Sequence, residues 1–292
     1  MLSEKIKTLR KQNNLTQENL AEKLNVSRQA ITKWETGAGT PDISNIEAIA
    51  KLFNLSIDEL LSGENVITQR ENVSRTEFDI FKACDFEFDF DTAHSLEIVE
   101  NDLEKVIIEV STDIDSPAYK LAKVKLVNGK SKDLAEISVK ADKKFVLPNG
   151  KPFTKQDAKA NLNVKVSLPK DLTRHIEING SLVSLNLHGF SVSKHFEFDG
   201  KVEEVEIYDM KGRFELTSGA DMVIKYDGTL EQLDINQLNA LSTLILTKNA
   251  KVNVYNEGRA CNVVFDGYEN AEDAENKVEL NGRKSELTVK CE

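Results

Sequence analysis

The spacing of apolar residues changes once along the chain, and the change separates two kinds of secondary structure. Up to about residue 62, apolar residues recur at three- and four-residue intervals, as in Leu2, Ile6 and Leu9, which is typical of amphipathic helices. From Phe78 onward apolar and polar residues alternate, which is typical of strands. We therefore expect an all-α part followed by an all-β part. The predicted helices cover residues 3–12, 16–24, 27–35, 43–53 and 56–61.

The third of these helices, residues 27–35, is predicted to have one polar and one apolar face. At about 100° per residue, its long hydrogen-bonding side chains share one arc: Arg28, Gln29, Thr32 and Lys33. Ile31 and Trp34 fall on the opposite arc. Asn25, just before this helix, suits the left-handed conformation that ends the preceding one. Two helices joined so closely form a helix-turn-helix, and its second helix fits the major groove of B-DNA.

The side chains on the polar arc are suited to the edges of DNA bases. Arg28 can donate two hydrogen bonds to guanine, and Gln29 can bond adenine through both groups of its amide. Each good contact of this kind discriminates between bases by about 1–3 kcal/mol. The alternative is that the arc is only the solvated face of a five-helix bundle, with no partner.

The stretch "LTQENLAEKLNVSRQAITKWETGAGTPDISNIEAIAKLFNLSIDELL" resembles the phage-repressor/Cro type of helix-turn-helix domain, also called the xenobiotic-response-element family. The matching features are T-Q opening the second helix, V-S opening the third, I-x-x-W-E-x-G closing it, and the final S-x-D-E-L-L. Asn25 departs from the family, which commonly has Gly there. The resemblance covers about residues 1–61.

This resemblance implies a role for particular residues and a partner. It implies that Gln17 holds a backbone phosphate of double-stranded DNA. It further implies that the start of the third helix faces the groove, through Ser27, Arg28, Gln29, Thr32 and Lys33. Proteins of this family usually bind as dimers to two half-sites, about one helical turn or a multiple of it apart. We therefore expect a homodimeric regulator, and a repressor rather than an activator.

The second part of the chain is predicted to be a series of short strands. In "FDIFKACDFEFDFD", Phe86, Phe88 and Phe90 lie on one side of a strand and acidic residues on the other. Strands separated by Gly, Asn and Asp turns continue to the end of the chain. Two segments are candidates for helices within this part, residues 154–160 and 269–276.

A weak repeat indicates how these strands are arranged. "IEINGSLVSLNLHG" and "FEFDGKVEEVEIYD" align with Gly180 and Gly200 in corresponding positions, and "IKYDGTLEQLDINQ" matches them at Gly228. A period near twenty residues without a helix favours a β-solenoid, in which successive turns stack strand on strand. The alternative is an antiparallel β-sandwich. The run from Asn163 to Gly189 also resembles an adhesin-like bacterial β-solenoid family of undefined biochemistry, often linked to the cell envelope.

The stretch between the two parts is polar and lacks an apolar stripe, so we interpret residues 63–77 as a linker. The alternative is a strand that joins the next domain, since Val66 and Ile67 are apolar. We expect a helix-turn-helix DNA-binding domain over residues 1–62. Residues 78–292 would then form a β-rich domain for oligomerisation or signal sensing, with a small molecule or a protein as its effector.

The charge of the chain supports this division of labour. The formal net charge is −11, which is unusual for a protein that binds nucleic acid. Residues 1–62 hold eight basic and eight acidic side chains, so the whole excess of acid lies in the remainder. The β-rich part is therefore a poor candidate for contact with phosphate.

Composition favours a soluble cytoplasmic protein without a membrane contact. The three cysteines, Cys84, Cys261 and Cys291, are far apart and form no metal-binding or disulfide pattern. The first residues mix charged and apolar side chains, unlike a signal peptide. No apolar run approaches the roughly 20 residues of a membrane span.

The remaining candidates for chemistry are weak, and we predict no enzyme, no cofactor, no metal site and no catalytic residue. Gly129-Lys130-Ser131 ends like a phosphate loop, but Val124 stands where the pattern needs Gly. The four histidines lack ligands at metal spacing, and the carboxylates of "DFEFDFD" lack the loop of a calcium site. We expect a sequence-specific DNA-binding regulator. The alternative is a protein-interaction or cell-envelope-linked scaffold in which the β-solenoid is the functional part.

Overall fold

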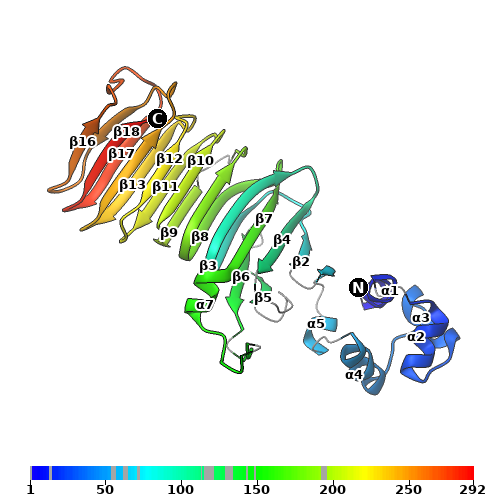
Figure 1. The fold of residues 1–292 in the computed structure, drawn as a ribbon. Coiled ribbons are helices and arrows are strands. Elements are labelled where there is room, and N and C mark those ends of the chain that lie inside the picture. Colours follow the sequence, from blue (N-terminus) through cyan, green and yellow to red (C-terminus); the bar gives the residue numbers. More distant parts are fainter. Residues whose placement is uncertain are drawn as a thin grey trace. The chain divides into compact units, whose positions relative to one another are not determined.

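The computed structural model describes residues 2–12, 15–53, 57–61, 65–70, 73–112, 114, 122–128, 134–142, 144–147, 149–191 and 196–292. The chain separates into two compact units, each described here by itself (Figure 1). One unit comprises Met1–Gln69 with Arg75–Phe78 and is mainly helical. The other comprises Arg70–Ser74 with Asp79–Glu292 and is built of strands. The predicted fold class, all-α followed by all-β, is confirmed.

The helical unit contains five helices in the part that is described. Its centre consists of side chains with no exposed surface, namely Ile6, Leu20, Ile31, Ile49 and Leu60. These positions come from the predicted apolar stripes, so the helices pack with those stripes inward. The helices are α1 (Leu2–Gln12), α2 (Gln17–Leu24), α3 (Arg28–Thr36), α4 (Ile43–Leu52) and α5 (Ile57–Leu61).

Among the described residues, side-chain caps begin helices α2, α3 and α4. The hydroxyl of Thr16 accepts from the backbone N–H of Asn19, and that of Ser27 accepts from Ala30. Asp42 caps α4 in the same way, and hydrogen bonds to its carboxylate, first of all from the backbone of Asn45, lower its pKa. Each cap satisfies an amide that would otherwise have no partner in the first turn. The starts of α2 and α3 are therefore encoded locally.

The range interpreted as a linker contains strands. Strand β1 spans Asn65–Arg70 and β2 spans Val73–Asp79. In β2 the side chains of Ser74 and Thr76 are buried, which an extended solvated linker would not produce. The structure therefore has the alternative that the sequence left open, a strand, over much of residues 63–77. The predicted boundaries at residues 62 and 78 stay predictions.

The β-rich unit is a flattened solenoid built from two ladders of parallel strands. One ladder runs through β6, the first half of β3, the first half of β8, and then β9, β11, β13, β17 and β15. The other runs through β7, the second halves of β3 and β8, and then β10, β12, β14, β18 and β16. One strand from each ladder makes a turn of the solenoid, which we call a rung. The strands are β3 (Cys84–Asn101), β4 (Lys105–Thr112), β5 (Ala122–Asn128), β6 (Leu134–Ala141), β7 (Leu162–Pro169), β8 (Thr173–His188), β9 (Phe196–Lys201), β10 (Glu204–Tyr208), β11 (Arg213–Ser218), β12 (Val223–Tyr226), β13 (Gln232–Leu238), β14 (Leu241–Leu246), β15 (Asn253–Asn256), β16 (Asn262–Asp266), β17 (Lys277–Arg283) and β18 (Glu286–Cys291).

The parallel register confirms the solenoid and excludes the sandwich. Val205 of β10 lies beside Ile224 of β12, so the chain advances by one rung in 19 residues. A sandwich of hairpins would pair such neighbours in antiparallel fashion. Antiparallel pairing is found between β4 and β7 and between β5 and β6, toward the start of this unit.

The solenoid is filled by stacked apolar columns. Phe86, Phe88 and Phe90 point inward with at most 2% of their surface exposed, as their alternation predicts. Phe196 and Phe214 lie side by side on β9 and β11, with ring centroids 4.7 Å apart. Each rung therefore covers the apolar end of the one before it.

The repeat at glycines is confirmed at two of its three positions. Gly180 and Gly200 lie in register on β8 and β9, where a Cβ on Gly200 would be 1.8 Å from the carbonyl oxygen of Gly180. Gly228 does not belong to this column. It follows β12 and lies against Ala250 and Val252. Its match was wrong because a strand–Gly–strand pattern occurs at both edges of a rung.

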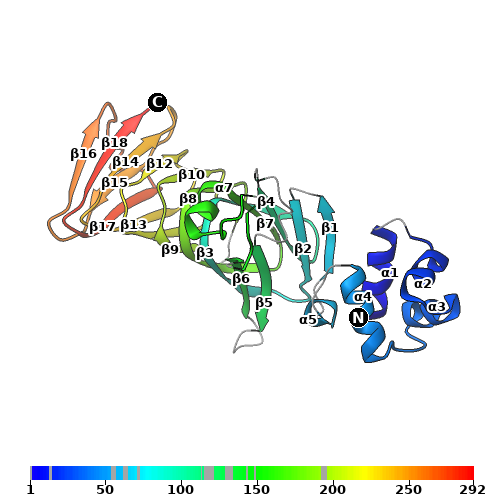
Figure 2. The same ribbon diagram turned by 60° about the horizontal axis from the view of Figure 1, so that its bottom comes forward.

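One of the two helix candidates in this unit is confirmed. Helix α7 (Lys155–Asn161) begins at the N-cap Thr154 with a capping box and lies against β3 (Figure 2). The acidic run at residues 269–276 forms turns instead. Its groups bind the edge of β15, a long-range interaction that competes with helix formation. In the described residues no helix is long and apolar enough to cross a membrane.

Candidate nucleic-acid interface

The corner between α2 and α3 is made by Asn25. Its backbone has φ 54° and ψ 44°, the left-handed conformation that its position predicts. Its N–H donates to Glu22 O over 3.1 Å, and the N–H of Val26 donates to Ala21 O over 3.0 Å. These bonds satisfy carbonyl groups at the end of α2 and turn the chain at once into α3.

Helix α3 is held by its apolar side and leaves its polar side free. Ile31 has no exposed surface and Trp34 has 7%, and both belong to the core of the helical unit. The predicted groove-facing side chains are all exposed, and four of them form what we call the reading face: Arg28, Gln29, Thr32 and Lys33. Ser27 is also exposed, with its hydroxyl engaged as the cap of α3.

The reading face carries positive charge without a tight internal partner for it. The Nε of Arg28 lies 3.8 Å from Glu18 Oε2, and both side chains are more than 60% exposed. A solvated pair at that distance contributes between about 0 and 1 kcal/mol. Arg28 can therefore exchange this carboxylate for a base or a phosphate at little cost.

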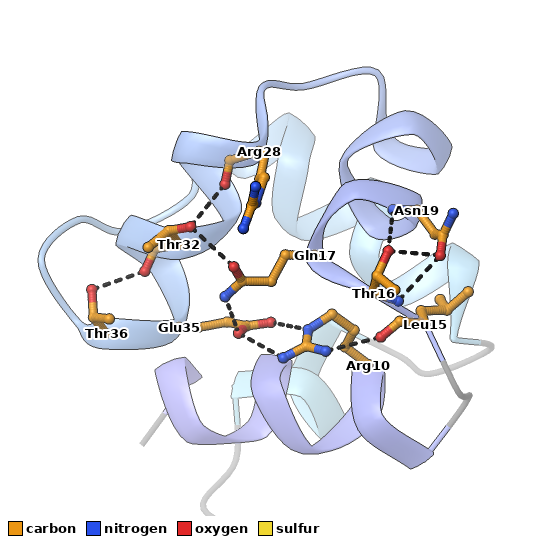
Figure 3. A network of polar contacts seen from close by, with 9 residues as sticks. All are labelled: Arg10, Leu15, Thr16, Gln17, Asn19, Arg28, Thr32, Glu35 and Thr36. Atoms are coloured by element: carbon orange, nitrogen blue, oxygen red, sulfur yellow. Dashed lines mark hydrogen bonds and ion pairs between the residues drawn. The ribbon is translucent and has the colours of Figure 1, made fainter.

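Gln17 lies in a network that links α1, α2 and α3 (Figure 3). Its amide nitrogen donates to Glu35 Oε2 over 2.8 Å, and its oxygen accepts from the hydroxyl of Thr32 over 3.3 Å. Arg10 donates to both oxygens of Glu35, at 2.5 and 3.0 Å. The structure thus brings together two predicted site residues, Gln17 and Thr32, and joins them to two that were not predicted.

The Arg10–Glu35 pair fixes α3 on the rest of the unit. Burial favours the neutral form of Glu35, but hydrogen bonds from Arg10 and Gln17, with the charges of Arg10 and Lys7, outweigh it and hold the pKa of Glu35 below its ordinary value. The same hydrogen bond raises the pKa of Arg10. The two residues are 25 positions apart, and the only signal in the sequence is a carboxylate on the inner side of α3.

Among the described residues one cluster of the β-rich unit has the donor set for a metal. Ligand atoms of His175, Glu177 and Glu197 lie within 4.8 Å of one another. His175 Nε2 and Glu197 Oε1 are 3.9 Å apart, an ion pair when the histidine is protonated. Glu87 lies opposite Glu177, and burial together with the charges of Glu177, Glu136 and Asp89 raises its pKa. The ion pair accounts for the cluster, so we assign no metal to it.

The corner, the buried side of α3 and its exposed polar side define a helix-turn-helix domain. The family model HTH_3, described as helix-turn-helix, matches residues 6–60. The chain is 41% identical over 64 residues to an uncharacterized HTH-type transcriptional regulator of Methanocaldococcus jannaschii, MJ0272, covering 97% of that protein and 22% of this chain. The chain belongs to the family of helix-turn-helix transcriptional regulators.

Two further relatives match the same end of the chain. It is 53% identical over 74 residues to the HTH-type transcriptional activator BcrR of Enterococcus faecalis, which is 25% of this chain and 36% of that protein. It is 32% identical over 106 residues to the immunity repressor protein of Bacillus phage phi105, which is 36% of this chain and 65% of that protein. The chain thus spans between about a third and two thirds of the length of these two relatives.

Two solved structures align with most of the chain at low similarity. A candidate cell adhesion protein from Clostridium sporogenes aligns with 14% identity and a TM-score of 0.35, over 77% of this chain and 100% of that one. A candidate adhesin from Bacteroides fragilis aligns with 9% identity and a TM-score of 0.39, over 76% and 98%. Values this low transfer no function to the β-rich unit.

Proposed function

We propose that the chain is a sequence-specific DNA-binding regulator that reads the major groove with α3, acts as a homodimer and represses its target. The observation that carries the proposal is that one side of α3 is buried and the opposite side is exposed. Ile31 and Trp34 anchor the helix, while the reading face stays exposed and carries the donors and the positive charge that base edges and phosphates accept. Family membership supports the same role.

Five of the six predicted residues have a proposed task at the DNA. Arg28 and Gln29 contact bases, and Lys33 contacts a base or a phosphate. Ser27 keeps α3 in place as its cap and offers an exposed hydroxyl. Gln17 donates the second hydrogen of its amide nitrogen to a phosphate, while the first stays on Glu35 and the amide oxygen keeps the hydrogen bond from Thr32. Phosphate contacts of this kind set the register of the protein on the duplex.

The acidic part of the chain supports contact through the helical unit. All of the net charge of −11 comes from residues 63–292, so duplex DNA is repelled by the β-rich unit. A protein whose partner is the chromosome works in the compartment that holds it, and we therefore propose a cytoplasmic location in a bacterial cell.

The test of the reading face is a binding titration by fluorescence anisotropy, with DNA taken from upstream of the protein's own gene. Arg28→Ala is expected to lose the preference for this DNA over scrambled DNA, because a bidentate contact is worth about 1–3 kcal/mol, or roughly 5- to 150-fold. Affinity of the unaltered protein should fall steeply with salt. Lys51→Ala, which removes an exposed charge on α4, is the control and should keep the preference.

An Arg28→Ala variant with unchanged preference would refute the reading face. The sign of regulation is tested with a reporter fused to the same upstream DNA. If the protein is a repressor, Arg28→Ala should raise reporter expression. If it is an activator, the same variant should lower reporter expression. The chain is similar both to an activator and to a repressor, so this measurement decides between the two modes of regulation.

A further inference from the structure

We propose that the outermost strand of the solenoid, β16 (Asn262–Asp266), is the surface through which two copies of this chain associate. The proposal rests on the homodimer proposed above and gives it a location. Strand β16 lies at the end of the β-rich unit (Figure 1). The last strands of the chain, β17 and β18, do not occupy this end, because they insert between the β13–β14 rung and the β15–β16 rung.

The other strand of the terminal rung, β15, is protected along its edge. Val252 exchanges two hydrogen bonds with the hydroxyl of Tyr268, at 2.9 and 2.8 Å. The N–H of Val254 donates to Asn270 Oδ1 over 2.8 Å, and the N–H of Ala271 donates to Val252 O. Val252 and Val254 are consequently buried to within 2% of their surface. The loop that carries Tyr268, Asn270 and Ala271 therefore covers the β15 side of the end of the solenoid.

The backbone edge of strand β16 has no such cover in residues 196–292, which the structure describes without a gap, although the ring of Tyr268 lies 6.4 Å from that of Phe265. Its one strand partner there is β18, in parallel register from Asn262 opposite Glu286 to Asp266 opposite Lys290. The N–H of Asn262 donates toward β18, to Ser285 O. Because successive residues of a strand point their backbone groups to alternate sides, those of Val263 and Phe265 face away from β18. An edge of this kind is a template for another strand.

The apolar core of the solenoid is also partly exposed to solvent at β16. Phe265 stacks on Val289, which stacks on Leu244 and then on Ile224, and these three have no exposed surface. Phe265 itself is 41% exposed and Val264 is 37% exposed. A further strand would cover Phe265 as each earlier rung covers its neighbour.

The sequence of β16 is complementary to itself in antiparallel pairing. With Val264 opposite Val264 of the second copy, Val263 lies opposite Phe265, and Asn262 lies opposite Asp266. Both outward-facing residues then form hydrogen-bonded pairs, the apolar side chains meet, and an amide meets a carboxylate. Such pairing has two-fold symmetry and closes after two copies. A second copy of this chain therefore fits the edge in chemistry and in symmetry.

The test measures the mass of the full-length protein by light scattering. The unaltered protein should give twice the chain mass of 32.7 kDa. Val264→Lys should give the single mass, because two like charges then meet at the symmetry axis. Val223→Lys is the matched control, since Val223 is 40% exposed but lies on β12, which has strands on both sides. This control should remain dimeric.

A mixing experiment tests the register. Val264→Glu should also give the single mass, and an equal mixture with Val264→Lys should regain the double mass. An unaltered protein with the single mass would overturn the interface, and so would charged variants that stay dimeric. A mixture that stays monomeric would overturn the central position of Val264.

The same samples test the proposed DNA role and the proposed interface separately. On DNA with one half-site, Val264→Lys should bind as the unaltered protein does, whereas Arg28→Ala should not. On DNA with two half-sites, Val264→Lys should lose about 100-fold or more in affinity, within the range expected when two linked sites are uncoupled. A monomer that binds DNA overturns only the interface, and a dimer without DNA preference overturns only the DNA role.

Discussion

At the scale of single residues, Glu35 determines how firmly α3 is held on the rest of the helical unit. Its side chain is 2% exposed and accepts hydrogen bonds from Arg10 and Gln17. A buried charge of this kind is tolerated only because its partners replace water. Removing the carboxylate leaves the guanidinium of Arg10, itself 12% exposed, without its counter-charge.

Glu35→Gln should therefore lower the free energy of unfolding of the helical unit by about 3 kcal/mol, at the lower end of the range for a broken buried pair. The chain has one tryptophan, Trp34 on α3, so its fluorescence during denaturation reports this unit alone. Glu18→Gln, which removes the exposed partner of Arg28, should cost less than about 1 kcal/mol. Equal losses in the two variants would contradict the assignment.

The same carboxylate predicts a dependence on pH. The folded-state pKa of Glu35 lies below its ordinary value of 4.5. Its contribution to stability is thus complete above that value and is lost as the pH falls through the folded-state pKa. Unfolding followed by Trp34 fluorescence at pH 6 and pH 3 should show a larger loss in the unaltered protein than in Glu35→Gln. A difference between the two proteins that does not change with pH would count against this.

At the scale of elements, the corner between α2 and α3 determines where the reading face points. Asn25 holds the left-handed conformation at φ 54°. Most side chains reach it only at a cost of about 1–2 kcal/mol, whereas Gly adopts it freely. The same corner can therefore be tightened or broken by one substitution.

Asn25→Gly should leave the stability of the helical unit unchanged or raise it by up to about 1 kcal/mol, and it should keep DNA affinity. Asn25→Val should lower stability by at least about 1–2 kcal/mol, because a β-branched side chain is strained at positive φ. Denaturation followed by Trp34 fluorescence checks both variants. If Asn25→Val proved as stable as the unaltered protein, the corner would not depend on this conformation.

At the scale of the whole molecule, the solenoid depends on how closely neighbouring rungs approach. Gly200 has φ 157° and its backbone meets that of Gly180 so closely that a Cβ would lie 1.8 Å from the carbonyl oxygen. A change of side-chain rotamer cannot relieve this clash, because the nearest atoms belong to the backbone of Gly180. The two rungs would have to separate locally.

Gly200→Ala should therefore destabilise the β-rich unit by about 1–3 kcal/mol, the usual range for overpacking. Thermal unfolding followed by the circular dichroism of the strands should show the loss, while Trp34 fluorescence should not. Gly219→Ala is the matched control, because a Cβ at Gly219 meets no atom within 4 Å. A similar loss in the control would show that the effect is not specific to the Gly180–Gly200 contact.

Local signals in the sequence predicted much of this architecture. Caps such as Thr16 and Ser27 act on amides three residues away, and Asn25 acts on its own backbone, so the helices and their corner follow from neighbouring residues. The alternation of Phe86, Phe88 and Phe90 likewise sets the inner side of a strand. The reading face could be predicted because a helix places residues by spacing alone. Its contact with DNA remains a proposal.

By itself, then, the sequence determined most of the elements, their inner and outer sides, and the two-part organisation, because each depends on residues close together in the chain. Only the tertiary structure decided which distant groups meet. Arg10 reaches Glu35 across 25 positions, Gly228 falls outside the glycine column, and β17 and β18 insert ahead of β15 and β16. Those arrangements result from the stacking of strands and helices that carry similar local patterns, and such patterns do not specify which neighbour is chosen.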